Sequence, residues 1–166
     1  MNGILLWIAQ GFGVGRIPFA PGTFGSLIGI LWLSVVIQTH NFWLSIAAIC
    51  AGLLFSVWVC GRAEGILKEK DPSSIVFDEV AAVPVCFIPW LAIEWMRLVD
   101  LPSTESFLRP PLLFVTLALV ILFRIFDIAK VWPARLLERW PGGWGITADD
   151  VVAACYVAVL AWLFVF

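Results

Sequence analysis

Five apolar runs divide this sequence, with shorter polar segments between them. The runs cover residues 24–37, 42–60, 80–93, 112–123 and 151–166. A helix of about 20 mainly apolar residues can cross a bilayer because its backbone polar groups are satisfied internally. Hydrophobic residues make up 62% of the 166-residue chain and charged residues only 13%, which excludes an ordinary soluble domain. The sequence therefore predicts an all-α, polytopic membrane helix bundle, a single domain over residues 1–166 with about four to five transmembrane helices.

The apolar runs differ in length and regularity. The first, together with the residues that begin its helix, gives about 15 to 17 residues, which is marginal for a span. Pro84 and Pro89 remove backbone donors from the third run, so we expect that helix to be kinked or split near the middle of the membrane. Residues 4–9 are too short for a signal sequence, and we expect them to pack at the membrane interface. Residues 100–111 are expected to form a loop.

Charge and cysteine content exclude several functions. A net charge of −2 gives no basic surface for nucleic acid. Cys50, Cys60, Cys86 and Cys155 lie in apolar runs without the spacing of a zinc or redox motif. The single histidine, His40, lies in a polar break between two runs, so nucleophilic chemistry that relies on histidine is not expected.

Lysine and arginine are distributed unequally between the two sides of a five-span arrangement. Arg97 and Arg109 fall on one side. The other side carries Arg16, Arg62, Lys68, Lys70, Arg124, Lys130, Arg135 and Arg139. Because basic residues are retained on the cytoplasmic side, we expect residues 4–21, 61–79 and 124–150 to face the cytoplasm and the C-terminus to lie outside.

Five acidic residues lie at the boundaries of the predicted spans, all at this cytoplasmic surface: Asp78, Glu79, Asp127, Asp149 and Asp150. One interpretation is interfacial solvation or helix capping, and residues 147–150 have the form of a capping box. Two adjacent pairs are harder to explain in this way, because neighbouring like charges repel unless a cation joins them. Clustered carboxylates without His or Cys indicate Mg²⁺ rather than Zn²⁺.

A mixed-charge segment lies beside these acids. Arg124, Asp127 and Lys130 are three residues apart, which places them within a broad arc of one helical face. A cation, an acid and a cation in this order suit a phosphate group and its metal. The alternative is an Arg124–Asp127 ion pair at the surface with Lys130 extended toward water.

Glycine-rich segments begin the first and last spans. They cover residues 11–15, 21–26 and 142–145. Glycine lets a backbone approach a phosphate closely, and a helix N-terminus adds partial positive charge, so we predict that Thr23 and Ser26 contribute to substrate binding. The alternative is that these glycines only form turns or allow helices to pack closely.

Four sequence blocks, taken together, resemble the phosphatidylglycerophosphatase A family. They are GFGVG with PGTFGS at 11–15 and 21–26, SIVFDE at 74–79, FRIFDIAK at 123–130 and GGWGITADD at 142–150. The resemblance covers about residues 11–154 and implies a Mg²⁺-dependent lipid phosphatase of the bacterial inner membrane. Such an enzyme removes the terminal phosphate of phosphatidylglycerophosphate to give phosphatidylglycerol.

Residue roles follow from matching these blocks. We predict that Asp78, Glu79, Asp149 and Asp150 bind Mg²⁺. Arg124 and Lys130 are predicted to be catalytic and to bind phosphate. Asp127 is predicted to be catalytic as a further metal ligand, as a base for water or as a nucleophile, and the sequence does not separate these roles.

A different class of function remains open at this stage. A small transporter or channel subunit could use the proline-broken run and the boundary acids to pass a cation or a proton. Such a protein is expected to carry charge near the middle of the membrane, whereas the apolar runs of this chain contain almost none. The predicted partners are the phospholipid substrate and the surrounding membrane lipid, and no oligomeric state is predicted.

Overall fold

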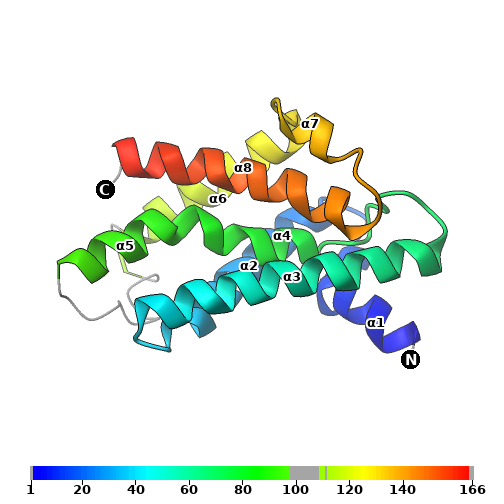
Figure 1. Cartoon of the computed structure of the whole chain (residues 1–166), viewed down its shortest axis with the longest axis horizontal. Coiled ribbons are helices and arrows are strands. Elements are labelled where there is room, and N and C mark those ends of the chain that lie inside the picture. The colour runs from blue at the N-terminus through cyan, green and yellow to red at the C-terminus, as the bar shows by residue number, and fades with distance from the viewer. Residues whose placement is uncertain (1, 98–108, 111, 165–166) are drawn as a thin grey trace.

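A computed structural model describes residues 2–97, 109–110 and 112–164 (Figure 1), and every regular element in this part of the chain is a helix. The elements are α1 (Asn2–Ala9), η1 (Gly11–Arg16), α2 (Pro21–Ile37), α3 (Phe42–Leu67), α4 (Phe77–Ala82), η2 (Val83–Phe87), α5 (Ile88–Met96), α6 (Leu112–Ala129), α7 (Ala134–Leu137) and α8 (Gly143–Phe164). The predicted all-α membrane bundle is confirmed.

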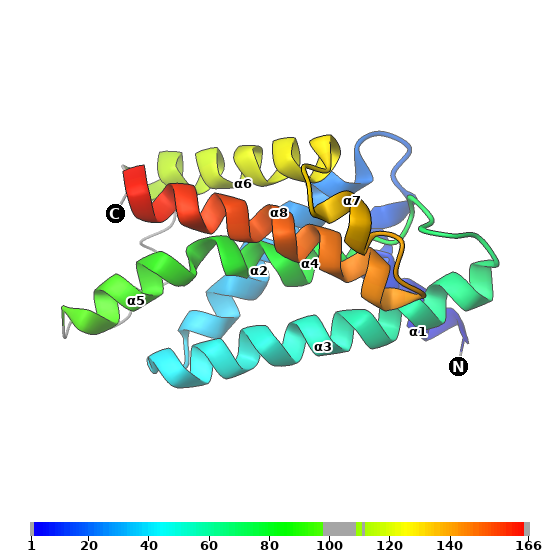
Figure 2. The same ribbon diagram turned by 45° about the horizontal axis from the view of Figure 1, so that its top comes forward.

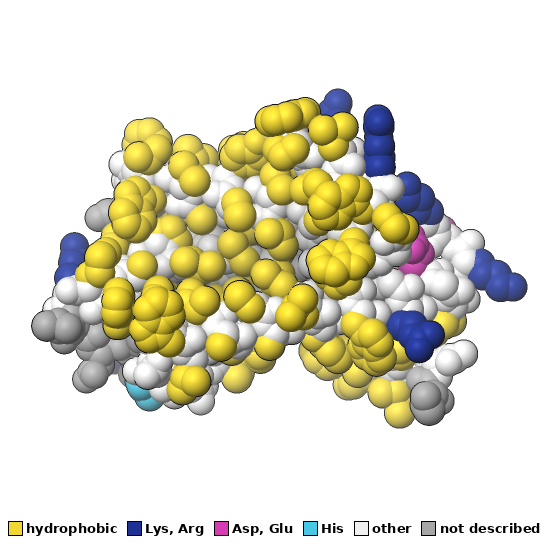
Figure 3. All heavy atoms as spheres, in the orientation of Figure 1, with side chains coloured by type: hydrophobic (Ala, Val, Ile, Leu, Met, Phe, Trp, Pro, Cys, Tyr) yellow, Lys and Arg dark blue, Asp and Glu magenta, His cyan; other side chains and the backbone are white. Residues whose placement is uncertain are grey.

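Four helical stretches among the described residues are long and apolar enough to cross a membrane. They are α3, the continuous stretch Phe77–Met96, α6 and α8, whereas α2 is apolar but has 17 residues. Large apolar side chains such as Leu31, Leu54 and Phe114 are exposed on the outer faces of these helices. Figure 3 shows such side chains over most of one face. This surface is suited to lipid and not to water.

The third span is interrupted as its prolines predict. It consists of α4, the 3₁₀ segment η2 and α5 in succession. Pro84 and Pro89 have no backbone N–H and cannot donate to the carbonyl groups of Val80 and Val85, so the α-helical bonding pattern is lost locally.

The α4–η2 segment lies at the centre of the bundle. Figure 2 shows α6, α8, the α4–α5 segment and α3 side by side, and α2 packs on α4 from behind. A Cβ at Gly29 of α2 would lie only 2.7 Å from the Val83 Cβ atom, so the glycine permits the close packing of α2 on this segment. Helices α3 and α8 also pack closely, because a Cβ at Gly143 would overlap the Val57 carbonyl. A hydrogen bond of 2.9 Å between the Ser56 and Thr147 hydroxyls joins the same two helices.

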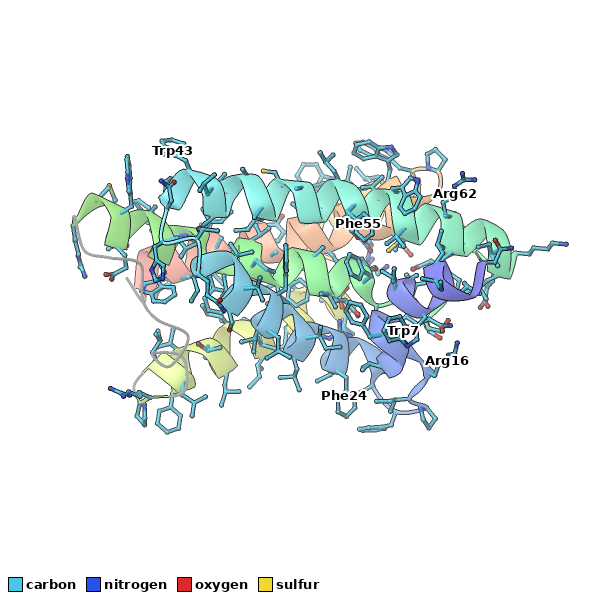
Figure 4. All side chains as sticks on the ribbon, turned by 90° about the horizontal axis from the view of Figure 1, so that it is seen from below. Trp7, Arg16, Phe24, Trp43, Phe55 and Arg62 are labelled. Carbon is cyan, nitrogen blue, oxygen red and sulfur yellow. The ribbon has the colours of Figure 1, made fainter. Side chains whose placement is uncertain are left out.

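The two ends of the bundle differ in charge. In Figure 3, Lys and Arg side chains gather mainly at the end where α3 finishes and α8 begins. In Figure 4, Trp7, Arg16 and Arg62 lie toward this end, whereas Trp43 lies at the opposite one. We refer to this charged end of the bundle below as the polar end. Helix α1 packs beside α3 there. The position of residues 4–9 at the membrane interface stays a prediction.

Two helices extend beyond their apolar runs. Helix α6 continues past Phe123, where the fourth run ends, to Ala129. Helix α8 begins at Gly143, within the glycine-rich segment predicted to begin the last span, eight residues before the apolar run at 151. The predicted boundary acids therefore lie inside helical turns. Arg124 and Lys130 pair with three of them, Glu79, Asp127 and Asp149. Thr147 lies within α8 and bonds Ser56, so residues 147–150 do not form a capping box. The predicted loop at 100–111 lies outside the described residues, except 109 and 110.

Candidate active site

The first acidic pair lies in the first turn of α4. Asp78 and Glu79 are both buried, although they follow directly on a polar loop. The segment that precedes them is held by a backbone bond from the Val76 N–H to the Ala9 carbonyl, at 3.0 Å. This bond ties the start of α4 to the end of α1, and the two carboxylates consequently enter the bundle instead of facing water.

Arg124 joins α4 to α6. Its Nη1 atom donates to Glu79 Oε1 at 2.6 Å and lies 2.6 Å from Asp127 Oδ2, one turn further along α6. All three side chains are less than 20% exposed. The Arg124–Asp127 ion pair was the alternative interpretation of this segment, but its burial and the additional bond to Glu79 distinguish it from an ordinary surface pair.

The N-terminal turn of α2 packs directly against this group. A Cβ at Gly22 would overlap Glu79 Oε1 and would lie 2.6 and 2.8 Å from the two Arg124 Nη atoms. A Cβ at Gly25 would lie 2.7 Å from Glu79 Oε2. The glycines of residues 21–26 therefore provide the space that the Glu79–Arg124 pair occupies.

A second charged group is centred on Lys130, which follows the last residue of α6 with a left-handed φ of 44°. Its Nζ atom donates to Asp149 Oδ2 at 2.8 Å and lies 3.1 Å from Glu138 Oε1 and 3.8 Å from Asp71 Oδ2. Asp149 is buried in α8, whereas Glu138 and Asp71 are about 36–40% exposed. Lys130 thus links α6, α8 and two connecting segments.

The electrostatics of the Lys130 group favour the charged ammonium. Burial lowers the pKa of Lys130, but its bonds to Asp149 and Glu138 act against this and raise the pKa above its usual value. Burial also raises the pKa of the Asp71 carboxyl, which Lys130 lowers only in part. Lys130 is therefore a permanent positive charge at neutral pH.

The four predicted metal ligands share an unusual property. Each keeps one buried carboxylate oxygen without a hydrogen-bond partner among the described residues: Asp78 Oδ1, Glu79 Oε2, Asp149 Oδ1 and Asp150 Oδ2. Buried polar atoms of native proteins are rarely left unpaired by protein groups, and a bound ion or water commonly satisfies those that are. Asp150 interacts electrostatically with Asp127 and the other three acids, so the acids form one negatively charged region.

The donor set suits Mg²⁺, although the side chains do not form a closed cage. Within the described residues, no group of three or more His, Cys, Asp or Glu side chains stands in an arrangement that would hold a metal ion. Mg²⁺ is commonly bound through one or two carboxylates, with waters and phosphate oxygens completing its shell. Asp78, Glu79, Asp149 and Asp150 each offer an unpartnered oxygen of the kind that this ion takes, so one or two of them fit it as ligands.

The two hydroxyl residues predicted to bind substrate differ in exposure. Thr23 is exposed near the start of α2, so its role stays a prediction. Ser26 is fully buried and donates to the Gly22 carbonyl at 2.9 Å. This bond uses the hydroxyl proton inside the helix, and the structure gives no support to substrate binding by Ser26.

Sequence reasoning missed Asp71 and Glu138. Both lie in polar connections, and nothing in their local sequence distinguishes them from other surface acids. The fold alone brings them close to Lys130. Their distance from Lys130 along the sequence gave no indication of these contacts.

Nearly the whole chain is similar in sequence to a family of known proteins. A sequence model of the phosphatidylglycerophosphatase A family matches residues 7–165. This chain belongs to that family. Proteins named phosphatidylglycerophosphatase A from Haemophilus influenzae and Escherichia coli are 33% and 34% identical over 159 and 149 residues. The matches cover 92% and 88% of this chain, and 83% and 74% of the two relatives.

A further relative has a different name. A Bacteroides thetaiotaomicron protein that bears the provisional name phosphatidylinositol-3-phosphatase is 32% identical over 164 residues, which is 94% of this chain and 92% of that protein. No solved structure matches this chain. Membership of the phosphatidylglycerophosphatase A family identifies the protein as a membrane-embedded phosphatase, and the transporter alternative has no comparable support.

Proposed function

We propose that this protein hydrolyses the terminal phosphate of phosphatidylglycerophosphate, with Mg²⁺, at the cytoplasmic surface of the bacterial inner membrane. The products are phosphatidylglycerol and inorganic phosphate. The observation that carries the proposal is the pairing of Arg124 and Lys130 with buried acids that keep unpartnered oxygens. The names of the Haemophilus and Escherichia relatives support the choice of substrate.

The two cations supply charge where the reaction needs it. Either water or the Asp127 carboxylate attacks phosphorus, the bond from phosphorus to the glycerol oxygen breaks, and the leaving oxygen takes a proton. If Asp127 attacks, water then hydrolyses the aspartyl-phosphate and restores the carboxylate. Negative charge is spread over the phosphate oxygens during this exchange, and fixed positive groups stabilise it. Arg124 has an unpartnered, buried Nε atom in addition to its bonded Nη1 atom, so it retains a donor for phosphate.

Asp127 has three possible chemical roles. It lies 2.6 Å from Arg124 Nη1 and is 14% exposed, so the guanidinium orients it at the edge of the buried region. It can act as the base that takes a proton from water, as a nucleophile or as a further metal ligand. Burst kinetics and acid trapping of a phosphorylated protein distinguish the nucleophile from the other two roles.

Asp78, Glu79, Asp149 and Asp150 are the residues that would hold Mg²⁺. When bound, this ion neutralises part of the charge on the phosphate. Removal of divalent metal with EDTA is expected to abolish phosphate release by the purified protein, and excess Mg²⁺ to restore it. Hydrolysis at an unchanged rate in EDTA would contradict the assignment of the carboxylates.

The distribution of basic residues supports the cytoplasmic position. Eight of the ten Lys and Arg residues fall on one side of the predicted topology, and Arg16 and Arg62 lie toward the polar end in Figure 4. A cysteine introduced by Lys70→Cys, in the polar loop before α4, is expected to react with a membrane-impermeant maleimide only in inverted vesicles. Labelling in intact spheroplasts instead would contradict this orientation.

The name of the Bacteroides relative supports a second candidate, phosphatidylinositol 3-phosphate, because that protein matches nearly the whole of this chain. Phosphate release should therefore be compared for both lipids, phosphatidic acid and a soluble phosphomonoester, in detergent micelles with and without Mg²⁺. We expect the highest kcat/KM for phosphatidylglycerophosphate. A clear preference for the inositol lipid would replace the substrate while leaving the reaction class intact. Absence of release from all four compounds would refute the proposed function.

A further inference from the structure

Lys130 has more acidic neighbours than its proposed role requires. Beside buried Asp149, its ammonium faces Glu138 at 3.1 Å and Asp71 at 3.8 Å. The distance to Glu138 lies within the range of a charge-assisted hydrogen bond, whereas the distance to Asp71 does not. Glu138 is therefore the second direct partner of Lys130.

The backbone fixes Glu138 relative to the start of α8. Its N–H donates to the Ala134 carbonyl at 3.0 Å, which anchors it at the end of α7. A Cβ at Gly145 would lie 2.8 Å from the Glu138 carbonyl oxygen and would overlap the Trp140 carbonyl. The chain around Glu138 thus lies directly on α8 at Gly145, with no room for a side chain between them.

This packing holds both partners of Lys130 on one helical unit. Gly145 and Asp149 are four residues apart in α8 and share a face of the helix. Glu138 lies against that face at Gly145, and Asp149 projects from it one turn later. The ammonium therefore bridges a buried carboxylate and a partly exposed one whose backbone positions are mutually fixed.

The bridge restricts a side chain that is otherwise flexible. Lysine has four rotatable carbons and three N–H donors, and Lys130 lies beyond the end of α6 with a quarter of its side chain exposed. Asp149 and Glu138 engage two donors. Asp71 lies 3.8 Å from the ammonium, beyond hydrogen-bond distance, so a third donor is left for a phosphate oxygen.

We propose that Glu138 is a positioning residue, which holds the Lys130 ammonium beside Asp149 so that its remaining donor meets the phosphate of the substrate. This inference rests on the proposed function, since it requires Lys130 to bind phosphate. Glu138 itself takes no part in bond breaking, and its effect is expected on phosphate binding more than on turnover.

The test uses the full-length protein in detergent with three variants. Glu138→Ala removes the acceptor, Glu138→Gln keeps an acceptor of the same length without the charge, and Glu69→Ala is a matched control. Glu69 is an exposed acid of the loop before α4 that makes no ion pair within the described part of the chain. The measurements are kcat and KM for the preferred lipid, the inhibition constant of inorganic phosphate and the melting temperature.

We expect Glu138→Ala to raise both KM and the phosphate inhibition constant by about tenfold, which is the effect of losing one hydrogen bond to a charged group, with kcat changed less than about threefold. Glu138→Gln should recover most of this loss, and Glu69→Ala should match the wild type. A purely structural role would lower the melting temperature and kcat without a selective change in KM.

Three results would overturn the inference. An unchanged KM in Glu138→Ala excludes positioning, and a lower KM shows that Glu138 competes with phosphate for Lys130. A Lys130→Met variant with the KM and phosphate inhibition constant of the wild type would show that Lys130 does not bind phosphate, so Glu138 could not act by positioning it. Each of these results requires an active wild-type protein, so they are distinct from failure of the proposed function, in which the wild type releases no phosphate.

Discussion

Replacing Gly22 with alanine tests whether the Glu79–Arg124 pair must stay where the structure holds it. The added methyl group would overlap Glu79 Oε1 and would lie 2.6 and 2.8 Å from the Arg124 Nη atoms. Gly22 is an ordinary helical residue in the first turn of α2. Alanine is favoured over glycine in a helix by about 1 kcal/mol, so the substitution does not oppose the local backbone.

The displacement can be worked out from these contacts. Ordinary contact with a methyl carbon begins at 3.4 Å, so the Arg124 guanidinium must retreat by about 0.6 to 0.8 Å and the Glu79 carboxylate by more. A misplacement of about 1 Å in an active site can lower the rate about 10²-fold, or about 2.7 kcal/mol of transition-state stabilisation. We therefore expect Gly22→Ala to lower kcat/KM by about two orders of magnitude.

The assay is phosphate release from the preferred lipid in detergent micelles, together with the melting temperature of each variant. Gly29→Ala is the matched control, because its Cβ would also push α2 away from α4 and η2, but by contacting Val83 and the Val80 carbonyl instead of the Glu79–Arg124 pair. It is expected to lower the melting temperature while changing kcat/KM by less than Gly22→Ala does.

The reasoning is refuted if Gly22→Ala is fully folded and retains kcat/KM within about threefold of the wild type. The same applies if Gly29→Ala loses as much activity as Gly22→Ala, because the loss would then reflect helix separation and not displacement of the ion pair.

Three further substitutions test other parts of the site. Asp127→Asn is expected to lower kcat at least about 10³-fold with normal membrane insertion, and near-wild-type turnover would argue against its catalytic role. Thr147→Val removes the bond to Ser56 and should cost about 0.6 to 1.7 kcal/mol in detergent-unfolding experiments, whereas no loss would show that the bond is dispensable. Tyr156→Phe removes the bond to the Trp132 carbonyl, at 2.5 Å. Because Trp132 lies in the turn directly after Lys130, the substitution should lower kcat/KM a few fold by loosening that turn. Unchanged kinetics would show that the turn does not depend on this bond.

The membrane spans were predictable because hydropathy and proline placement are local properties. The 17 residues of α2 and the interruption at Pro84 follow from the sequence alone. The end of α6 did not follow from the sequence, because a hydropathy boundary falls at the first charged residue. Arg124 lies inside α6, where Glu79 from α4 neutralises it, and a single segment of sequence does not reveal that pairing.

The candidate site was predictable in composition but not in arrangement. The acidic pairs and the Arg124–Lys130 segment indicated which side chains would gather. The division of the two cations between separate carboxylate groups depends on the packing of α4, α6 and α8. The glycines at the start of the first span were predicted to approach phosphate, whereas Gly22, in the first turn of α2, makes room for a charged pair of the protein itself.

The order of the charged partners along the chain bears on how this protein enters a bilayer during synthesis. An unpaired charge within a membrane is costly, and the N-terminal part of a protein is made first. Arg124 of α6 emerges after Glu79 of α4, and Asp149 of α8 emerges after Lys130. Each later charge thus meets an opposite one on an earlier segment. Exchanging a carboxylate with its cation would preserve the pair but reverse the order in which the two charges are synthesised.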